Sequence, residues 1–385
     1  MLKKIPKQVI ILGLISLFTD MASEMLYPIT PIFLASVLGA SMASVGLIEG
    51  LAEITAGFLK GYFGFLSDKL GKRSIFVVGG YSISALSKPL PGIFPKIFVV
   101  LISRVTDRIG KGVRTAPRDA LLAGYANSNN TGAIFGFHRG MDTLGAVLGP
   151  LIALLLLRIY DYNYSIIFII AFIPSAVAVA FTFFIKDKKV EVKEKKKAEY
   201  LRFWKESPQV YKSLVILIAI FSLVNSSDVF LILKSRNISH SDTTAILGYV
   251  FYNLIYAVSS YPAGLISDRI GKKRIYVSGL IIFSFVYFGF AASDNFMLTW
   301  ILFALYGIYA ASTEGILKAW VSDLVPYEKT ASAVGLITMV SSIAIFTGSI
   351  LAGYLWDAFG SSVPFYLSSA VSLIVAFSLL KISKK

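Results

Sequence analysis

The chain alternates between long apolar runs and short polar connectors from one end to the other. The apolar runs reach roughly the 20 residues that a helix needs to cross the hydrocarbon core of a bilayer. The pattern therefore predicts an all-α membrane protein with twelve transmembrane helices. Their expected ranges are 9–36, 43–67, 74–94, 97–122, 131–158, 163–185, 212–234, 243–267, 275–293, 296–322, 332–357 and 362–381.

The polar connectors divide the chain into halves. The one long hydrophilic stretch is rich in lysine and falls near the middle. We therefore expect an N-terminal six-helix bundle at 1–185, a cytoplasmic linker at 186–211 and a C-terminal six-helix bundle at 212–385.

The positive charges orient the chain in the membrane. Lysine and arginine gather in the linker, after the second and eighth expected helices and at both ends, and short cytoplasmic connectors are the basic ones. An even number of spans places both termini on that cytoplasmic side. Lys88, Lys96, Lys234 and Arg236 run against the pattern, because they fall near the opposite connectors.

Composition supports a membrane protein and excludes several other classes. The chain has 385 residues, of which 56% are hydrophobic and 15% charged, whereas soluble domains are roughly 25% charged. Its net charge of +15 could indicate nucleic-acid binding, but the basic residues lie in the connectors. There is no cysteine and there are only two histidines. We expect a multi-pass protein of the cell membrane with no nucleic-acid partner, no metal site and no cofactor.

An internal repeat relates the two halves. The loop GFLSDKLGKR at 64–73 returns as GLISDRIGKK at 264–273, an offset of 200 residues. An odd number of helices per repeat would invert the second half, but six keep the halves parallel. The repeat therefore predicts a pseudo-two-fold axis along the membrane normal.

The repeated loop has a readable local chemistry. Gly64 and Gly264 stand near a helix end, where the missing Cβ permits close helix approach. Gly71 and Gly271 suit a turn with positive φ. The aspartate of each copy can accept hydrogen bonds or pair with a basic group.

These motifs resemble those of the major facilitator superfamily, whose loop GxxxDxxGR(K)R(K) joins its second and third helices. Arg104 occupies the place of the superfamily's fourth-helix arginine, in RxxxGxG, although Arg108 stands where glycine is usual. The fifth helix carries a GxxxGP element associated with antiporter-type exporters, formed by Gly145, Gly149 and Pro150. The resemblance covers essentially the whole chain and implies two six-helix bundles. It implies a cytoplasmic gate formed by Gly64, Asp68, Gly71, Lys72, Arg73, Gly264, Asp268, Gly271, Arg118 and Asp119.

Ionisable residues inside membrane segments are costly and indicate functional sites. Six of them on the fourth expected helix fall within an arc of about 120°, which favours one polar stripe along a water-filled path. The second half is sparser. The candidates for substrate or proton binding are Asp20, Glu24, Glu49, Glu53, Arg104, Arg108, Lys111, Arg114, Arg139, Asp142, Asp228 and Glu314.

Two interpretations of these charges stay open at this stage. The acids could be static partners of Arg108, Lys111, Arg139 and Lys60, or one of them could bind and release a proton. The basic residues could bind an anionic or zwitterionic substrate, or could all be paired. His138 is expected to pack or to hydrogen-bond rather than to carry protons.

The sequence as a whole predicts a secondary active transporter of a small solute that works by alternating access. We expect proton coupling, export, a monomer and no enzymatic activity, and there is no nucleotide-binding GxxxxGK[ST] loop. The alternatives are a passive facilitator, a transporter-like sensor and, less favoured, a membrane-embedded enzyme.

Overall fold

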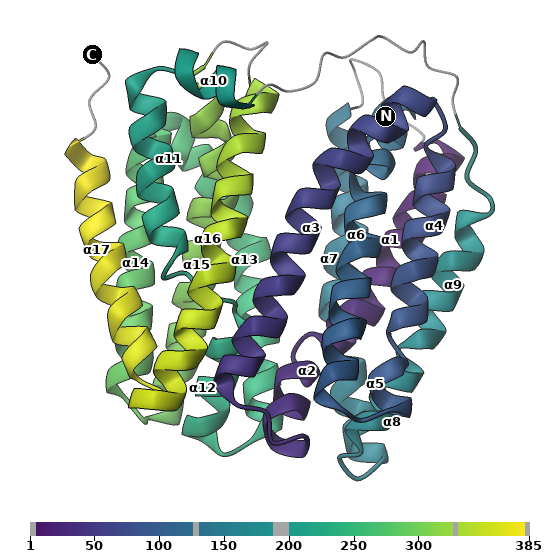
Figure 1. Ribbon diagram of the computed structural model, residues 1–385, viewed down its shortest axis with the longest axis horizontal. Helices are drawn as coiled ribbons and strands as arrows, with labels where there is room; N and C mark the ends of the chain where they lie inside the picture. The colour runs from purple at the N-terminus through teal and green to yellow at the C-terminus, as the bar shows by residue number, and fades with distance from the viewer. Residues whose placement is uncertain (1–4, 126–130, 188–199, 326–329, 382–385) are drawn as a thin grey trace. The chain divides into compact units, whose positions relative to one another are not determined.

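The computed structural model describes residues 5–125, 131–187, 200–325 and 330–381 (Figure 1). For some residues within helices, Asp68 and Asp268 among them, it describes the backbone alone. The described chain is helical, and each of the expected membrane segments overlaps one or more helices. By length and apolar composition, eight stretches of the described residues could cross a membrane.

The described chain divides into two compact units. Unit 1 comprises residues 1–40 and 51–195, and unit 2 comprises residues 41–50 and 196–385. The helices that begin in unit 1 are α1 (Lys7–Leu26), α2 (Ile29–Ile32), the π-helix η1 (Phe33–Val37), α4 (Ser74–Ser87), α5 (Leu90–Ile93), α6 (Ile97–Tyr125), α7 (Thr131–Ile159), α8 (Tyr164–Ile170) and α9 (Phe172–Thr182). Helix α3 (Met42–Leu70) begins in unit 2 and continues in unit 1.

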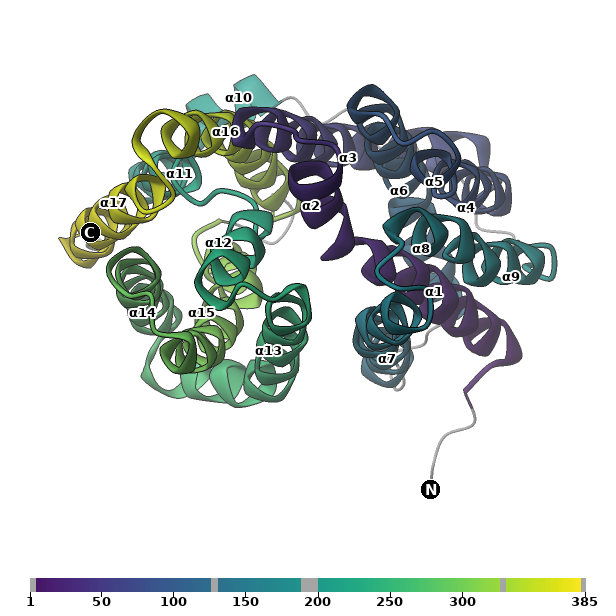
Figure 2. The ribbon, with the colours of Figure 1, turned by 90° about the horizontal axis from the view of Figure 1, so that it is seen from below.

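The other helices of unit 2 are α10 (Tyr200–Glu206), α11 (Gln209–Ser222), α12 (Val229–Ser239), α13 (Asp242–Ile270), α14 (Lys272–Ala292), α15 (Phe296–Ser322), α16 (Thr330–Phe359) and α17 (Val363–Lys381). Within this unit, α14 packs between α15 and α17 (Figure 2). The first turn of α3 is capped here, because the Asp357 carboxylate accepts the backbone N–H groups of Met42 at 2.9 Å and Ala43 at 2.8 Å.

Four of the expected membrane helices are interrupted. Prolines stand at or beside three of the breaks, at Pro28, Pro89 and Pro174, and proline lacks the amide hydrogen that continues a helix. The fourth break separates α11 from α12 and contains no proline. It holds the sequence Asn-Ser-Ser-Asp at 225–228, and such side chains compete with the backbone for hydrogen bonds.

Two lysines that run against the expected charge pattern are buried. Lys88 and Lys234 are each 3% exposed. The Lys234 amine donates to Ser361 Oγ at 3.2 Å and to Ser362 Oγ at 3.1 Å. These two residues therefore place little charge on the surface, which removes part of the conflict with the orientation rule.

Candidate functional site

Glycines of α7 and α4 bring the helices of unit 1 close enough for polar side chains to meet. A Cβ at Gly145 would lie 2.5 Å from Leu17 O, and one at Gly149 would lie 2.5 Å from Met21 O. Helices α1 and α7 are therefore in backbone contact along the GxxxGP element (Figure 2). A Cβ at Gly80 of α4 would lie 2.7 Å from Gly110 O of α6.

The polar stripe of α6 is divided by its surroundings. Arg104, Asp107 and Arg114 are buried, at 9%, 8% and 5% exposure. The side chains of Arg108, Lys111 and Arg118 are half-buried. We expected the whole stripe to line a water-filled path. Asp107 and Arg114 instead lie on the edge of the stripe that packs against α4.

The first polar cluster of unit 1 is a buried ion pair between α6 and the end of α4. Lys88 Nζ donates to Asp107 Oδ1 at 2.8 Å and to Ser23 Oγ at 3.0 Å. Ser84 Oγ also donates to Asp107 Oδ1. A cavity of about 20 Å³ adjoins the pair, which is room for about one water molecule. Its lining includes Ser23, Leu26, Lys88, Ser103, Arg104, Asp107 and Phe168.

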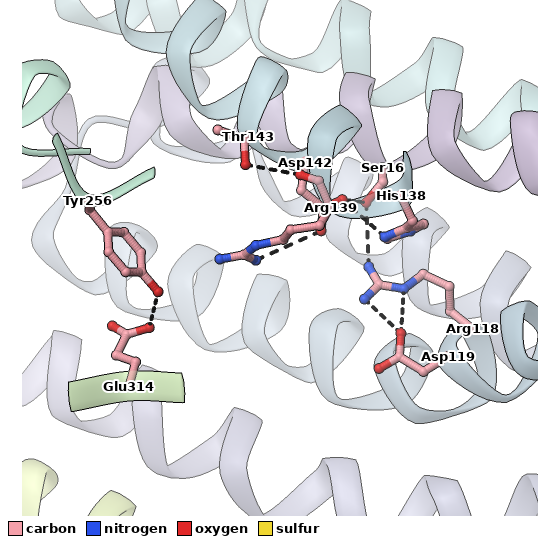
Figure 3. Close-up of polar contacts among 9 residues, drawn as sticks. All are labelled: Ser16, Arg118, Asp119, His138, Arg139, Asp142, Thr143, Tyr256 and Glu314. Atoms are coloured by element: carbon pink, nitrogen blue, oxygen red, sulfur yellow. Dashed lines mark hydrogen bonds and ion pairs between the residues drawn. The ribbon is translucent and has the colours of Figure 1, made fainter. Parts of the chain in front are cut away.

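The second cluster joins α1, α6 and α7 through Asp142 (Figure 3). Ser16 Oγ donates to Asp142 Oδ1, and Arg118 Nη1 donates to Ser16 Oγ at 3.5 Å. His138 Nδ1 lies 3.5 Å from Asp142 Oδ1, and Arg139 Nη1 lies 4.0 Å from Asp142 Oδ2. The site is therefore one carboxylate surrounded by a hydroxyl, an imidazole and a guanidinium group.

His138 and Arg118 complete this cluster in different ways. His138 is 4% exposed, and its Nε2 has no hydrogen-bond partner among the described residues. Arg118 binds Asp119 Oδ1 through Nε at 3.0 Å and Nη2 at 2.9 Å (Figure 3). Arg118 thus connects Asp119 of the expected gate to Ser16, and through Ser16 to Asp142.

The gate loop is partly described. Gly71 and Gly271 have φ values of 65° and 101°, which confirms the predicted positive-φ turns. A Cβ at Gly64 would lie 3.0 Å from Ala116 Cβ, whereas one at Gly264 would meet no described atom within 4 Å. The close-approach prediction is therefore confirmed for Gly64, and the described residues show no such approach at Gly264. The side chains of Asp68 and Asp268 lie outside the described residues.

Hydrogen bonds anchor the N-terminal end of α4 beside this loop. Arg73 Nη1 donates to Ala120 O at 3.1 Å. Asp187 accepts the N–H groups of Arg73 at 3.1 Å and Ser74 at 3.0 Å, and the Ser74 hydroxyl at 2.6 Å. Lys72 is exposed. Asp187 thus satisfies backbone groups at the start of α4 that have no partner within the helix.

The remaining acidic candidates lie on α1 and α3. Asp20 and Glu24 are half-buried on α1. Glu49 is 5% exposed and belongs to the part of α3 that clusters with unit 2, whereas Glu53 is exposed in the part that clusters with unit 1. The expected common face of Glu49 and Glu53 therefore spans the boundary between the units.

Unit 2 carries its own carboxylate site at the break between α11 and α12. Asp228 Oδ1 accepts the Tyr306 hydroxyl at 2.6 Å, and Asp228 Oδ2 accepts the Tyr252 hydroxyl at 3.2 Å. Further along the same helices, the Tyr256 hydroxyl donates to Glu314 Oε2 at 2.7 Å (Figure 3). Asp228 is therefore held by tyrosines of α13 and α15, and Glu314 by a tyrosine of α13.

Several partners in these clusters were missed by sequence reasoning. Lys88 was treated as an exception in a connector, although Ser84 and Lys88 are spaced four residues apart on one helical face. Ser16 likewise precedes Asp20 by four residues. That spacing places the members of each pair on one face of a helix. It is the sequence feature from which these partners could have been predicted. Nothing in the sequence marked Asp187 or Tyr306.

Comparison with known proteins agrees with this architecture. The model of the Major Facilitator Superfamily matches residues 12–239 and 229–385. The uncharacterized MFS-type transporter MJ1317 of Methanocaldococcus jannaschii is 35% identical over 98% of this chain and 95% of its own length. The quinolone resistance protein NorA of Staphylococcus aureus is 21% identical over 95% of this chain and 94% of its own.

Solved structures share the fold at low sequence identity. The nucleoside transporter NupG superposes with a TM-score of 0.82 at 14% identity, covering 99% of this chain and 100% of that one. The POT family transporter PepTSo gives 0.82 at 10% identity, covering 99% and 98%. The matching family model and the full-length relative together show that this chain belongs to the major facilitator superfamily, as a membrane transporter built from two related helical halves.

Proposed function

We propose that the protein is a proton-coupled secondary transporter that exports a small solute by alternating access, and that Asp142 is its proton site. The observation that carries the proposal is the Asp142 cluster. One carboxylate contacts the Ser16 hydroxyl and lies 3.5 Å from a buried imidazole. An acidic residue inside a membrane segment is costly to bury and commonly marks a proton pathway in transporters.

The cluster also offers a way to couple protonation to movement. Ser16 Oγ accepts from Arg118 and donates to Asp142, so it links the two charged groups. Protonation of Asp142 removes the negative charge that attracts Arg118 and His138. Because Arg118 also binds Asp119, the same event changes the charge balance at the expected gate.

The gate itself is part of the proposal. Arg73 at the start of α4 binds Ala120 O of α6, and Arg118 of α6 binds Ser16 of α1, so the two arginines link three helices of unit 1. Such contacts can form in one state of a two-state transporter and break in the other. We assign the loop residues 64–73 and their copies at 264–273 to this latch.

The proposed substrate is anionic or zwitterionic. Arg139 is exposed, with a side-chain exposure of 69%, and Arg108 and Lys111 are half-buried. Arg108 Nε has no hydrogen-bond partner among the described residues. Arginine can bind a carboxylate or phosphate through two parallel hydrogen bonds. Arg104 and Arg114 are weaker candidates because they are buried.

Transport in proteoliposomes tests the proton site. The solute is first chosen by thermal-shift screening of nucleosides, dipeptides, amino acids and quinolones, because a specific ligand stabilises the folded protein. We expect the wild type to accumulate this solute when a pH difference is imposed. Asp142→Asn should keep solute exchange without a gradient but lose the accumulation, because exchange needs no net proton movement.

Two results would contradict the proposal. If Asp142→Asn accumulated solute like the wild type, the proton site would be elsewhere, and Glu24→Gln and Glu53→Gln would be the next variants. If the wild type exchanged solute but ignored the pH difference, proton coupling would be wrong, and accumulation under no other ion gradient either would identify a passive facilitator. Asp294→Asn, an exposed aspartate of the loop between α14 and α15, is the matched control and should behave like the wild type.

A further inference from the structure

The break between α11 and α12 places a carboxylate where a continuous helix would present backbone. The two helices and the break together span residues 209–239, and the break at 223–228 lies near the middle of that length. Interrupted helices near the membrane centre commonly form ligand sites in transporters. The break joins the C-terminal end of α11, where the helix dipole favours positive charge, to the N-terminal end of α12, where it favours a carboxylate such as Asp228.

The side chain of Asp228 lacks the contact that an aspartate at the start of a helix usually makes. It is the N-cap residue of α12, but its side chain makes no capping hydrogen bond. An aspartate at this position ordinarily accepts a hydrogen bond from the second or third backbone N–H of the helix. Here Ser227 Oγ accepts from Val229 N at 3.4 Å, and the Asp228 carboxylate is turned toward Tyr252 and Tyr306 instead.

Tyrosine rings form a rigid wall beside this carboxylate. The ring centroids of Tyr252 and Tyr306 are 4.9 Å apart, and those of Tyr306 and Tyr309 are 5.2 Å apart. These three rings are at most 6% exposed, whereas Asp228 is half-buried. The tyrosines are therefore packed in the core of unit 2, and they fix a carboxylate that keeps part of its surface accessible.

The side chain of Asn225 adds a second acceptor at the break. Asn225 Oδ1 is buried and has no hydrogen-bond partner among the described residues.

We propose that this site binds the ammonium group of the transported solute, with Asp228 as its counterion and Asn225 as a second acceptor. An ammonium group supplies the positive charge and the N–H donors that these groups accept. Neighbouring aromatic faces add cation–π attraction. The inference rests on the proposed transport function and narrows its anionic or zwitterionic substrate to a zwitterion that carries an ammonium group.

Binding in detergent tests the inference without any transport. All four tryptophans lie in residues 204–356, so tryptophan fluorescence reports on unit 2. The probes are phenethylammonium and its uncharged analogue, phenethyl alcohol. We expect thermal stabilisation and a fluorescence change with phenethylammonium alone, and we expect Asp228→Asn to weaken binding by about tenfold or more, as loss of a charge-assisted contact would.

Control variants separate binding from folding. Asp294→Asn should bind phenethylammonium like the wild type. Tyr306→Phe removes one hydrogen bond to Asp228 but keeps the ring, so it should weaken binding less than Asp228→Asn does. A merely structural Asp228 would lower thermal stability in Asp228→Asn while leaving the response to phenethylammonium unchanged.

Other results of these experiments would contradict the ammonium site, the role of Asn225 or the proton-coupling proposal. Equal stabilisation of the wild type by phenethyl alcohol, or equal binding by Asp228→Asn, would overturn the ammonium site. Equal binding of tetramethylammonium, which has no N–H group, would overturn the role of Asn225. A wild type that binds phenethylammonium but accumulates no solute under an imposed pH difference would contradict the proton-coupling proposal and leave this site standing.

Discussion

Replacing Asp107 with asparagine removes one partner of the buried ion pair in unit 1. Lys88 and Asp107 are 3% and 8% exposed, and their charged atoms are 2.8 Å apart. Asparagine keeps an oxygen for the Ser84 hydroxyl but leaves the Lys88 charge uncompensated. Breaking such a pair from one side destabilises a protein by about 3–5 kcal/mol.

The expected shift in unfolding temperature follows from this cost. For proteins of 150–250 residues, 1 kcal/mol corresponds to about 2–4 °C. Unit 1 falls in this size range, so Asp107→Asn should lower its unfolding temperature by about 6–20 °C. Circular dichroism of the purified protein in detergent is the suitable assay, because the tryptophans report on unit 2 alone.

An exposed ion pair provides the matched control. Lys272 Nζ and Asp323 Oδ2 are also 2.8 Å apart, but their side chains are 22% and 49% exposed. Exposed pairs contribute about 0–1 kcal/mol, so Asp323→Asn should change stability little. The same substitution at the same distance then differs only in its surroundings.

A double variant completes the test. Lys88→Met combined with Asp107→Leu removes both charges and fills the space with apolar groups. Replacing a whole buried pair in this way is often neutral or stabilising, so the double variant should be more stable than either single one. The reasoning would be refuted if Asp107→Asn shifted the unfolding temperature no more than Asp323→Asn, or if the double variant lost the sum of both single effects.

Two further predictions concern helix packing and capping. Gly149→Ala should lower the yield of folded protein, because its Cβ would lie 2.5 Å from Met21 O. Gly140→Ala, whose Cβ would meet no described atom within 4 Å, should express normally. Size-exclusion chromatography compares the two variants, and equal yields would contradict the packing argument. Asp187→Ala should destabilise the start of α4 by about 0.5–2 kcal/mol, because the backbone N–H of Ser74 loses its acceptor. Hydrogen exchange of the backbone amides in the first turn of α4 measures this loss. Unchanged protection of these amides would show that the cap contributes little.

Local features of the sequence were sufficient for much of the fold. Apolar runs of membrane length predicted the helical segments, and a 200-residue repeat predicted two related halves. Gly71 and Gly271 were predicted to have positive φ because glycine alone tolerates it without strain. The resemblance to the major facilitator superfamily was recognised from the same repeated loop. These properties depend on neighbours in the chain, so the sequence contains them directly.

The partners of the charged residues depended on tertiary structure. Lys88 meets Asp107 because glycines let α4 and α6 approach, and Asp187 caps α4 from more than 100 residues away. In the sequence, Asp228 is one acidic residue among several. Only the tertiary structure shows that its carboxylate binds Tyr252 and Tyr306 instead of capping its own helix. The sequence by itself determined which residues carry charge and which segments enter the membrane. Burial and long-range contacts decided which of those charges are neutralised in the core and which stay accessible, because both depend on how helices distant in the chain pack together.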